Sequence, residues 1–309
     1  MHIYSLNFHK KKIWLVLLLL PFCSAPQLKK FNECRKFSVE RSADILSVND
    51  KKNNLYIILS QNKFSKNPGG EYLFQGDIYS LENDTIKKYK IINRDEFAFH
   101  PIAGSIFTNE KKVYLYILNH AVSYQFEIEK YEIQKKNLLF IKRYRISPEF
   151  YLTDISVLKN ETIILTGYKK SWISELGFYK GSGAVILLNA AKWKSYPSLN
   201  AAFQVEVDDQ NEDIYVFNGK KIEVFQKNSE NILLPVKIIK IKKSSGIVIN
   251  NSKLESFQTS SEFDEIKKVD ENKGDLIYRN TGNGADFIRY LNGFYIFNNS
   301  KKSYIEFCR

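Results

Sequence analysis

The chain has 309 residues, of which 44% are hydrophobic and 14% aromatic, with only 14 Gly and 7 Pro. This composition excludes a disordered chain and is typical of a globular protein with one large β domain or two ordinary domains. The formal net charge is +12, but the lysine pairs are scattered over expected turns rather than clustered with exposed aromatic residues, which excludes nucleic acid as a partner.

The first 22 residues have the layout of an export signal. Residues 9–12 read HKKK, an apolar run follows over 13–22, and CSAP occupies 23–26. The run is shorter than the roughly 20 apolar residues that a membrane-spanning helix needs. Leu20-Pro21-Phe22-Cys23 resembles a bacterial lipobox, in which Cys23 is lipidated and becomes the new N-terminus, although Phe22 replaces the usual small residue.

Two alternatives remain open for this segment. Cleavage after Ala25 would release a soluble exported protein, although Pro26 disfavours it, and an uncleaved segment would remain as an anchor. Every alternative places the body of the protein outside the cytosol. We therefore predict an exported lipoprotein at the cell envelope, held at the membrane by its lipid anchor, with a secreted protein as the alternative. The scattered lysines add weak attraction to an anionic membrane surface.

Two further cysteines lie near the ends of the mature chain. Cys34 is close to its start, and Cys308 is one residue from its end. In an oxidising compartment they can form a disulfide that ties the termini together, and two free thiols are the alternative. Closing a loop of this size would stabilise the fold by about 4–5 kcal/mol if the geometry permits.

From residue 53 onward, short runs of β-branched and aromatic residues alternate with clusters of Lys, Asn, Asp and Gly, a pattern typical of short strands joined by turns. The predicted strands are 54–60, 76–82, 113–118, 124–133, 137–146, 161–167, 183–189, 212–218, 221–226, 236–241, 274–280 and 294–299. Asn218-Gly219 is a strong hairpin signal, because it readily adopts the positive φ angles of a tight turn. The strand spacing of about ten residues, without a helical stripe or a linker, predicts one all-β domain, either a propeller or a large sandwich.

Motifs of several enzyme classes are absent. Beyond the signal there are two histidines, His100 and His120, and there is no GxSxG, HExxH or CxxC motif and no phosphate-binding glycine loop. What remains is a set of carboxylates and amides at the starts of predicted strands, in 42–46, 152–156, 198–203 and 263–276. Oxygen ligands from distant positions are what a hard cation such as Ca²⁺ requires. Singly, these residues are also explained as ordinary turn residues.

The order of these segments resembles the paraoxonase/arylesterase family, calcium-dependent lactonases and esterases built on a six-bladed β-propeller. The similar segments are FTNEKKVYLYILNHA (107–121), LTDISVLKNETIILTG (152–167), LNAAFQVEVDDQNEDIYVFN (199–218), VDENKGDLIY (269–278) and GNG (282–284). The family's terminal disulfide falls on Cys34 and Cys308. The resemblance implies an all-β, six-bladed propeller over 34–309, after a signal over 1–22 and a tether over 23–33.

The resemblance also implies two calcium ions in the central tunnel. The side-chain ligands of the structural ion fall on Asp44 and Asp154, which are both present. Three ligands of the catalytic ion fall on Asn200, Asp264 and Glu265, where Glu265 replaces an Asn of the family.

Three further positions depart from the family's catalytic pattern. The two remaining ligand positions hold Ala43 in place of Glu and Thr153 in place of Asn, and neither residue offers the carboxylate or amide oxygen that calcium prefers. His120 matches the outer histidine of the family's pair, whereas the inner histidine falls on Ile102. In the family, calcium polarises the ester carbonyl while a base activates water. This sequence keeps only part of that machinery.

Two hypotheses for the function follow. The first is a calcium-dependent hydrolase of aryl esters or lactones, with weakened or lost activity, in which Asn200, Asp264 and Glu265 hold the metal and His120 assists. The second is a non-catalytic surface lipoprotein that keeps the structural calcium and binds a ligand or a partner outside the cell.

Overall fold

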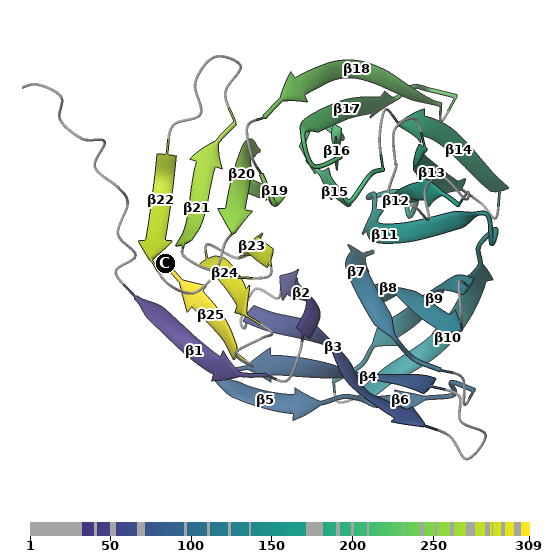
Figure 1. Ribbon diagram of the computed structural model, residues 1–309. Helices are drawn as coiled ribbons and strands as arrows, with labels where there is room; N and C mark the ends of the chain where they lie inside the picture. Colours follow the sequence, from purple (N-terminus) through teal and green to yellow (C-terminus); the bar gives the residue numbers. More distant parts are fainter. Residues whose placement is uncertain are drawn as a thin grey trace, which may run out of the picture.

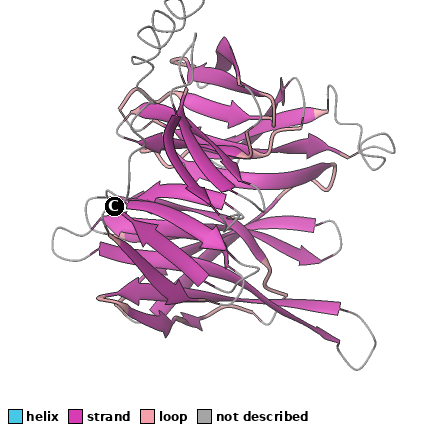
Figure 2. Ribbon diagram, turned by 60° about the vertical axis from the view of Figure 1, so that its left-hand side comes forward, coloured by secondary structure: helices cyan, strands magenta, loops and turns pink. Residues whose placement is uncertain are grey.

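The computed structural model shows six β-sheets arranged in a ring around a central axis (Figure 1). It describes residues 33–309 except 40–41, 50–53, 67–71, 96–97, 110–111, 123–124, 136, 171–181, 190–191, 199–200, 209, 231, 242–243, 251, 260–262, 270–275, 282–284, 286, 292–293 and 300–303. The described elements are all β-strands (Figure 2), and none of the described residues forms a helix that could cross a membrane. The export signal, Cys23 and Asn200 lie outside the described residues.

Each sheet forms one blade, and the chain builds blades 1 to 6 in order. Blade 1 contains β2 (Ser42–Asn49), β3 (Asn54–Lys66), β4 (Tyr72–Glu82) and β5 (Thr85–Lys88). Blade 2 contains β7 (Pro101–Thr108), β8 (Val113–Val122), β9 (Gln125–Ile133) and β10 (Asn137–Arg145), with the short β6 (Lys90–Ile92) parallel to β10 at its edge. Blade 3 contains β11 (Phe150–Val157), β12 (Ile163–Lys169), β13 (Gly183–Asn189) and β14 (Lys192–Ser198).

The second half of the ring repeats the same plan. Blade 4 contains β15 (Gln204–Val207), β16 (Ile214–Phe217), β17 (Lys221–Lys227) and β18 (Leu233–Lys240). Blade 5 contains β19 (Gly246–Asn250), β20 (Lys253–Thr259), β21 (Phe263–Lys268) and β22 (Leu276–Thr281). Blade 6 contains β23 (Phe287–Leu291), β24 (Phe294–Asn299), β25 (Tyr304–Cys308) and, from the other end of the chain, β1 (Cys34–Ser38). The six-bladed propeller expected from the sequence is confirmed.

The first strand of each blade lies nearest the axis, and the following strands step outward (Figure 1). Middle strands are covered by a blade on either side, so they read as continuous apolar runs. In β8, the fully buried Leu115 and Ile117 pack toward blade 1, whereas Tyr116 and Leu118 pack toward blade 3. Among the described residues, a hydrophobic cluster fills each of the six junctions between neighbouring blades, and each fully buried Leu or Ile there contributes about 1.5–3 kcal/mol.

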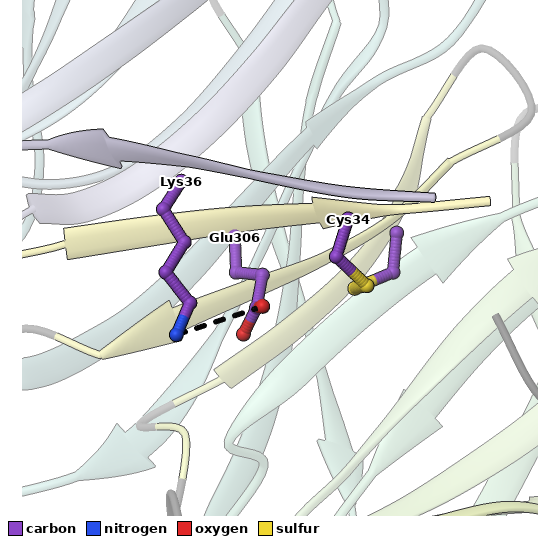
Figure 3. The surroundings of a disulfide bond; sticks show 4 residues. Cys34, Lys36 and Glu306 are labelled. Atoms are coloured by element: carbon purple, nitrogen blue, oxygen red, sulfur yellow. Dashed lines mark ion pairs between the residues drawn. A yellow bond between two sulfur atoms is a disulfide. The ribbon is translucent and has the colours of Figure 1, made fainter. Parts of the chain in front are cut away.

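The ring is closed by the two ends of the chain in blade 6. β1 pairs antiparallel with β25, and this register sets Cys34 directly opposite Cys308. Their sulfur atoms form the expected disulfide, with a Cα–Cα distance of 4.2 Å (Figure 3). The Nζ atom of Lys36 lies 3.8 Å from Oε1 of Glu306 on the same pair of strands. The disulfide pairing predicted from the sequence is therefore confirmed, and the two free thiols are not.

The hairpin predicted at Asn218-Gly219 joins β16 and β17, but its turn differs from the expected one. Only Gly219 has a positive φ, +85°. Asn218 instead accepts the N–H of Lys221 on its side-chain oxygen at 2.9 Å, and its own N–H donates to the Lys221 carbonyl at 3.0 Å. The asparagine side chain therefore closes the turn, while glycine alone supplies the left-handed backbone.

Candidate functional site along the propeller axis

Three inner strands carry a β-bulge. The pairing of β2, β7 and β11 with the strand that follows each of them shifts by one residue, which leaves one residue of the inner strand without a partner. The three unpaired residues are Ala43, Ile102 and Thr153. Bulges of this kind re-aim side chains and often border active sites. The three positions that depart from the family's catalytic pattern are thus equivalent positions of blades 1, 2 and 3.

The side chains of the three bulge residues are poorly suited to metal binding or proton transfer. Ala43 and Ile102 are half-buried and pack against the apolar clusters between blades. The Thr153 hydroxyl donates to the carbonyl oxygen of Ala202 at 2.7 Å, and the Thr166 carbonyl oxygen lies at 3.1 Å. Neither a metal ligand of the preferred kind nor a proton-transfer group is present at these positions.

An aspartate directly follows the bulge in blades 1 and 3. Asp44 and Asp154 are only 2% and 4% exposed. Each carboxylate accepts the N–H of the isoleucine that follows it, at 2.8 and 2.9 Å. Each also accepts an N–H from the inner strand of the next blade, from Gly104 and from Val205, both at 3.0 Å. These backbone donors explain why a carboxylate stands in an apolar strand: it clamps one blade to the next.

Two other inner strands are clamped in the same way by neutral side chains. Ser105 of blade 2 accepts the N–H of Val157 of blade 3 at 3.0 Å. Gln204 of blade 4 accepts the N–H of Ile247 of blade 5 at 2.9 Å and donates to its carbonyl oxygen at 2.7 Å. A side chain near the axis therefore links each pair of neighbouring blades from blade 1 to blade 5.

Arg289 of β23 brings a positive charge to the same part of the tunnel. Its Nε and Nη2 each lie 3.2 Å from Oδ1 of Asp44, and its Nη1 donates to Oε1 of Glu206. Glu206 also accepts a hydrogen bond from Gln204 at 2.8 Å. We call Asp44, Asp154, Glu206 and Arg289 the axial cluster. Its members come from blades 1, 3, 4 and 6.

Burial and the charges of neighbouring groups shift the pKa values of Asp154, Glu206 and Arg289. Burial raises the pKa of Asp154 to about 7; the charge of Arg289 opposes this rise and that of Asp44 adds to it. Burial also raises the pKa of Glu206, against the pull of Arg289. Burial alone would lower the pKa of Arg289, but the three carboxylates raise it above its ordinary value. The guanidinium is therefore always charged, while the cluster holds an excess of acidic groups.

The axial cluster does not fit the structural calcium ion that the resemblance implies. Calcium takes six to eight oxygen ligands. Here the oxygens of Asp44 and Asp154 each accept backbone N–H groups, and the guanidinium of Arg289 occupies Oδ1 of Asp44. A hydrogen already points at each of these four carboxylate oxygens, and a fixed positive charge repels a dication. Calcium at this position stays a prediction that the donor set does not favour.

A cavity of about 250 Å³ adjoins the axial cluster. Its walls are formed by the inner strands of five blades, and the polar residues Ser47, Ser105, Ser156, Glu206 and Arg289 lie there among apolar ones. The side chain of Glu206 keeps 22% of its surface exposed, so solvent and small solutes can reach it. Among the described residues, both hydrogen bonds to Glu206 end on Oε1, so Oε2 can still accept a hydrogen bond.

The two histidines lie at the other end of the inner strands, near the start of β11. Their ring centroids are 5.9 Å apart. The ring of His120 stacks on Phe126 at 4.7 Å and meets the edge of Tyr151 at 6.3 Å. Burial lowers the pKa of His120, and the charge of Lys170 lowers it further, so the imidazole is neutral at pH 7. Because β11 rises about 3.3 Å per residue, this end lies well away from the cavity at Ile155–Val157.

Asp264 and Glu265 lie in β21, the third strand of blade 5 counted from the axis. With about 4.8 Å between neighbouring strands, their backbone is two strands outward from the inner strand β19. The backbone of Asp44 and Asp154 thus lies in inner strands, whereas the backbone of Asp264 and Glu265 does not. The role of Asp264 and Glu265 as metal ligands stays a prediction. A polar residue before an apolar run indicates where a strand starts. It does not indicate whether that strand is the inner, a middle or the outer strand of its blade.

Sequence reasoning missed Arg289, Glu206 and Gln204. A signal for Arg289 does exist: in FIRYL (287–291), apolar residues flank the arginine on both sides. In a short strand this alternation places the charge on the face opposite to Ile288, which is fully buried between blades. Glu206 and Gln204 alternate in the same way in β15, so period-two patterning could have flagged all three as axis-facing.

Comparisons with known proteins support the fold alone. No family model matches the chain, and no curated protein matches it in sequence. Among solved structures, the chain is similar to a luciferin-regenerating enzyme, with 8% identity, a TM-score of 0.54 and coverage of 88% of this chain and 92% of that one. It is also similar to a protein from Lactobacillus plantarum, with 12% identity, a TM-score of 0.49 and coverage of 78% and 74%.

Proposed function

We propose that this protein is a non-catalytic, exported propeller that binds a small cationic organic ligand, such as an amine, in the cavity beside the axial cluster. One observation carries the loss of catalysis: the bulges of blades 1, 2 and 3 hold Ala43, Ile102 and Thr153. These positions border the tunnel where a metal-assisted hydrolase needs oxygen ligands and a base. The Thr153 hydroxyl, the only polar group among the three, already donates to a buried carbonyl.

The chemistry of the cavity favours a positively charged ligand. Three acidic groups of the axial cluster face a single guanidinium, and that guanidinium is already paired with Asp44 and Glu206. The Oε2 atom of Glu206 and the hydroxyls of Ser47 and Ser156 remain as acceptors on the cavity wall. A volume of about 250 Å³ is just below the range of ordinary small-molecule pockets, so the ligand is small. A protonated amine with a short apolar body matches these walls.

Calorimetry and thermal shift on the mature, disulfide-bonded protein test this binding. The probes are putrescine and choline, with acetate and succinate as anionic counterparts of similar size. We expect saturable binding of a cation and none of the anions. The variant Glu206→Gln should lose the binding, whereas Glu230→Gln, an exposed turn glutamate of the same blade, should keep it. Equal binding of cations and anions, or full binding by Glu206→Gln, would overturn the assignment.

The calcium-dependent hydrolase is the second candidate, and the histidine pair is the observation that favours it. His120 is neutral at pH 7 because of its lowered pKa, as a general base must be, and it lies 5.9 Å from His100. Phenyl acetate and simple lactones, assayed with calcium and with chelator, separate the two candidates. The binding proposal predicts no turnover above that of His120→Gln. Chelator-sensitive hydrolysis that His120→Gln abolishes would establish the hydrolase instead.

Attachment to the cell envelope through a lipid on Cys23 is part of the proposal. It rests on the arrangement of the N-terminal residues alone, HKKK, the apolar run 13–22 and LPFC at 20–23. The disulfide between Cys34 and Cys308 supports export, because such bonds form and persist mainly in oxidising compartments.

A further inference from the structure

The axial cluster raises a question that the ligand proposal does not answer: why an arginine lies at the centre of the propeller. Its side chain is only 19% exposed, and its carboxylate partner Asp44 is 2% exposed. Several acidic groups so close together repel each other when ionised, and each loses solvation on burial. A cation among Asp44, Asp154 and Glu206 therefore stabilises their ionised forms.

We infer that Arg289 is the axial cation of this propeller. Its guanidinium is a positive charge that belongs to the protein itself and stands in for the charge of a bound metal ion. The fold therefore needs no metal at the axis. This inference is independent of the proposed ligand, which concerns the cavity beside the cluster rather than the charge within it.

The shape of the guanidinium suits this task better than an ammonium group would. It is planar and permanently charged, and it offers several N–H donors in a fixed fork. Nε and Nη2 lie at 3.2 Å from the same oxygen of Asp44, while Nη1 reaches Glu206. One side chain from blade 6 thus connects blade 1 with blade 4. A spherical ion could balance the charge, but it could not satisfy these directional acceptors with hydrogen bonds.

The position of Arg289 also adds a fifth clamp between blades. Side chains of Asp44, Ser105, Asp154 and Gln204 link the inner strands from blade 1 to blade 5. Arg289 joins blade 6 back to blade 1. Asp44 uses Oδ2 for the N–H of Gly104, whereas its Oδ1 accepts both the N–H of Ile45 and the guanidinium of Arg289.

A specific consequence follows from the cavity. Because Arg289 is part of the cavity wall, shortening its side chain to alanine extends the cavity to the carboxylates. The variant Arg289→Ala should therefore gain a site for a small cation, and methylguanidinium and Ca²⁺ are the probes. Methylguanidinium reproduces the donors that are lost, whereas Ca²⁺ replaces only the charge.

The first test uses the wild-type mature protein. Metal content is measured by mass spectrometry after purification in calcium-containing buffer, and Tm is measured with calcium and with EDTA. The inference predicts no stoichiometric calcium and the same Tm in both buffers. One calcium ion per chain, together with a Tm that EDTA lowers, would overturn it even if no variant folds.

The second test compares Arg289→Ala with Arg35→Ala, a matched variant of an exposed pair with Asp84 in which both side chains are at least 60% exposed. Arg289→Ala should lower Tm by roughly 10 °C, because it leaves buried charges uncompensated, and Arg35→Ala should barely change it. Methylguanidinium should raise the Tm of Arg289→Ala by clearly more than that of Arg35→Ala, whose guanidinium at the axis is intact. An equal small effect of both substitutions, or a folded Arg289→Ala that neither cation stabilises, would contradict the inference.

Discussion

The Nε atom of Arg289 lies 3.2 Å from Oδ1 of Asp44, although 245 positions separate the two residues in the chain. The contact joins the inner strand of the last blade to that of the first. At the outer edge of blade 6, β1 pairs with β25 and the disulfide links the two strands. The ring is therefore closed twice, by an ion pair at the axis and by a covalent bond further out.

The first prediction concerns the energetic coupling between Arg289 and Asp44. Arg289→Met and Asp44→Asn should each cost about 3–5 kcal/mol, because each leaves a buried charge without its partner. The double variant should cost less than the sum of the two, by at least about 1 kcal/mol, since it removes both charges. Denaturant unfolding of the four proteins measures the difference.

The exposed pair Arg35–Asp84 provides the control cycle. Its side chains are 60% and 64% exposed, so its coupling should stay within about 0–1 kcal/mol. Strict additivity at Arg289 and Asp44 would show that the two groups do not stabilise each other.

The second prediction concerns the disulfide. The variant Cys34→Ser/Cys308→Ser should lose about 4–5 kcal/mol of stability, because the bond closes nearly the whole propeller. Thiol titration of the wild-type protein should find no reactive thiol from this pair, both before and after unfolding without reductant. Two titratable thiols in the unfolded, unreduced chain would rule out the bond.

The third prediction tests the bulge in blade 3. Thr153→Val keeps the shape of the side chain but removes the hydroxyl that donates to the buried Ala202 carbonyl. Loss of this hydrogen bond should cost about 1–2 kcal/mol. Thr85→Val, at an exposed strand end, serves as the control and should change little. A stability equal to that of the control would mean that water replaces the missing hydroxyl.

The fourth prediction concerns acid stability and a buried carboxylate in blade 2. Glu129 is fully buried and accepts hydrogen bonds from Arg94 at 2.9 and 3.0 Å, from Arg143 at 3.2 Å and from Tyr131. Burial alone would raise its pKa, but the hydrogen bonds and charge of Arg94, with Tyr131 and Arg143, lower the pKa below its ordinary value of 4.5.

Because the pKa of Glu129 is lower in the folded state, its contribution is present above the unfolded value and is lost as the pH falls below it. Stability should therefore decrease below about pH 4.5, and more steeply in the wild-type protein than in Glu129→Gln. Urea unfolding at pH 7, 5, 4 and 3 would show this, with the exposed Glu149→Gln as the control. Identical pH profiles for wild type and Glu129→Gln would exclude the linkage.

The fifth prediction concerns the anchor. Labelled palmitate should be incorporated into the wild-type protein in a bacterial host that processes lipoproteins, and Cys23→Ser should carry no label and leave the membrane fraction. Cys34→Ser serves as the control and should keep the label. Incorporation into Cys23→Ser would show that this cysteine is not the lipidated one.

The sequence by itself located many of the middle and outer strands, whereas none of the six inner strands is among the runs singled out from it. Alternating β-branched and aromatic runs such as 113–118, 183–189 and 221–226 fall within β8, β13 and β17, because side chains on a pleated strand between two blades are buried on both faces. The terminal cysteines and the order of the polar segments pointed to a closed six-bladed ring. The positions of Asp44 and Asp154 as buried axial carboxylates were also accessible, since a lone acid in an apolar run must have partners.

Only the tertiary structure decided which partners those carboxylates have. The donors to Asp44 are its neighbour Ile45, Gly104 from the next blade and Arg289 from the last one, and no local pattern relates such distant positions. Propeller strands repeat the same local pattern at every distance from the axis, so the sequence alone does not say that the backbone of Asp264 belongs to the third strand of its blade. Closure of the ring brings the guanidinium of Arg289 to Asp44 at the axis, a contact between the last blade and the first that only the folded chain can form.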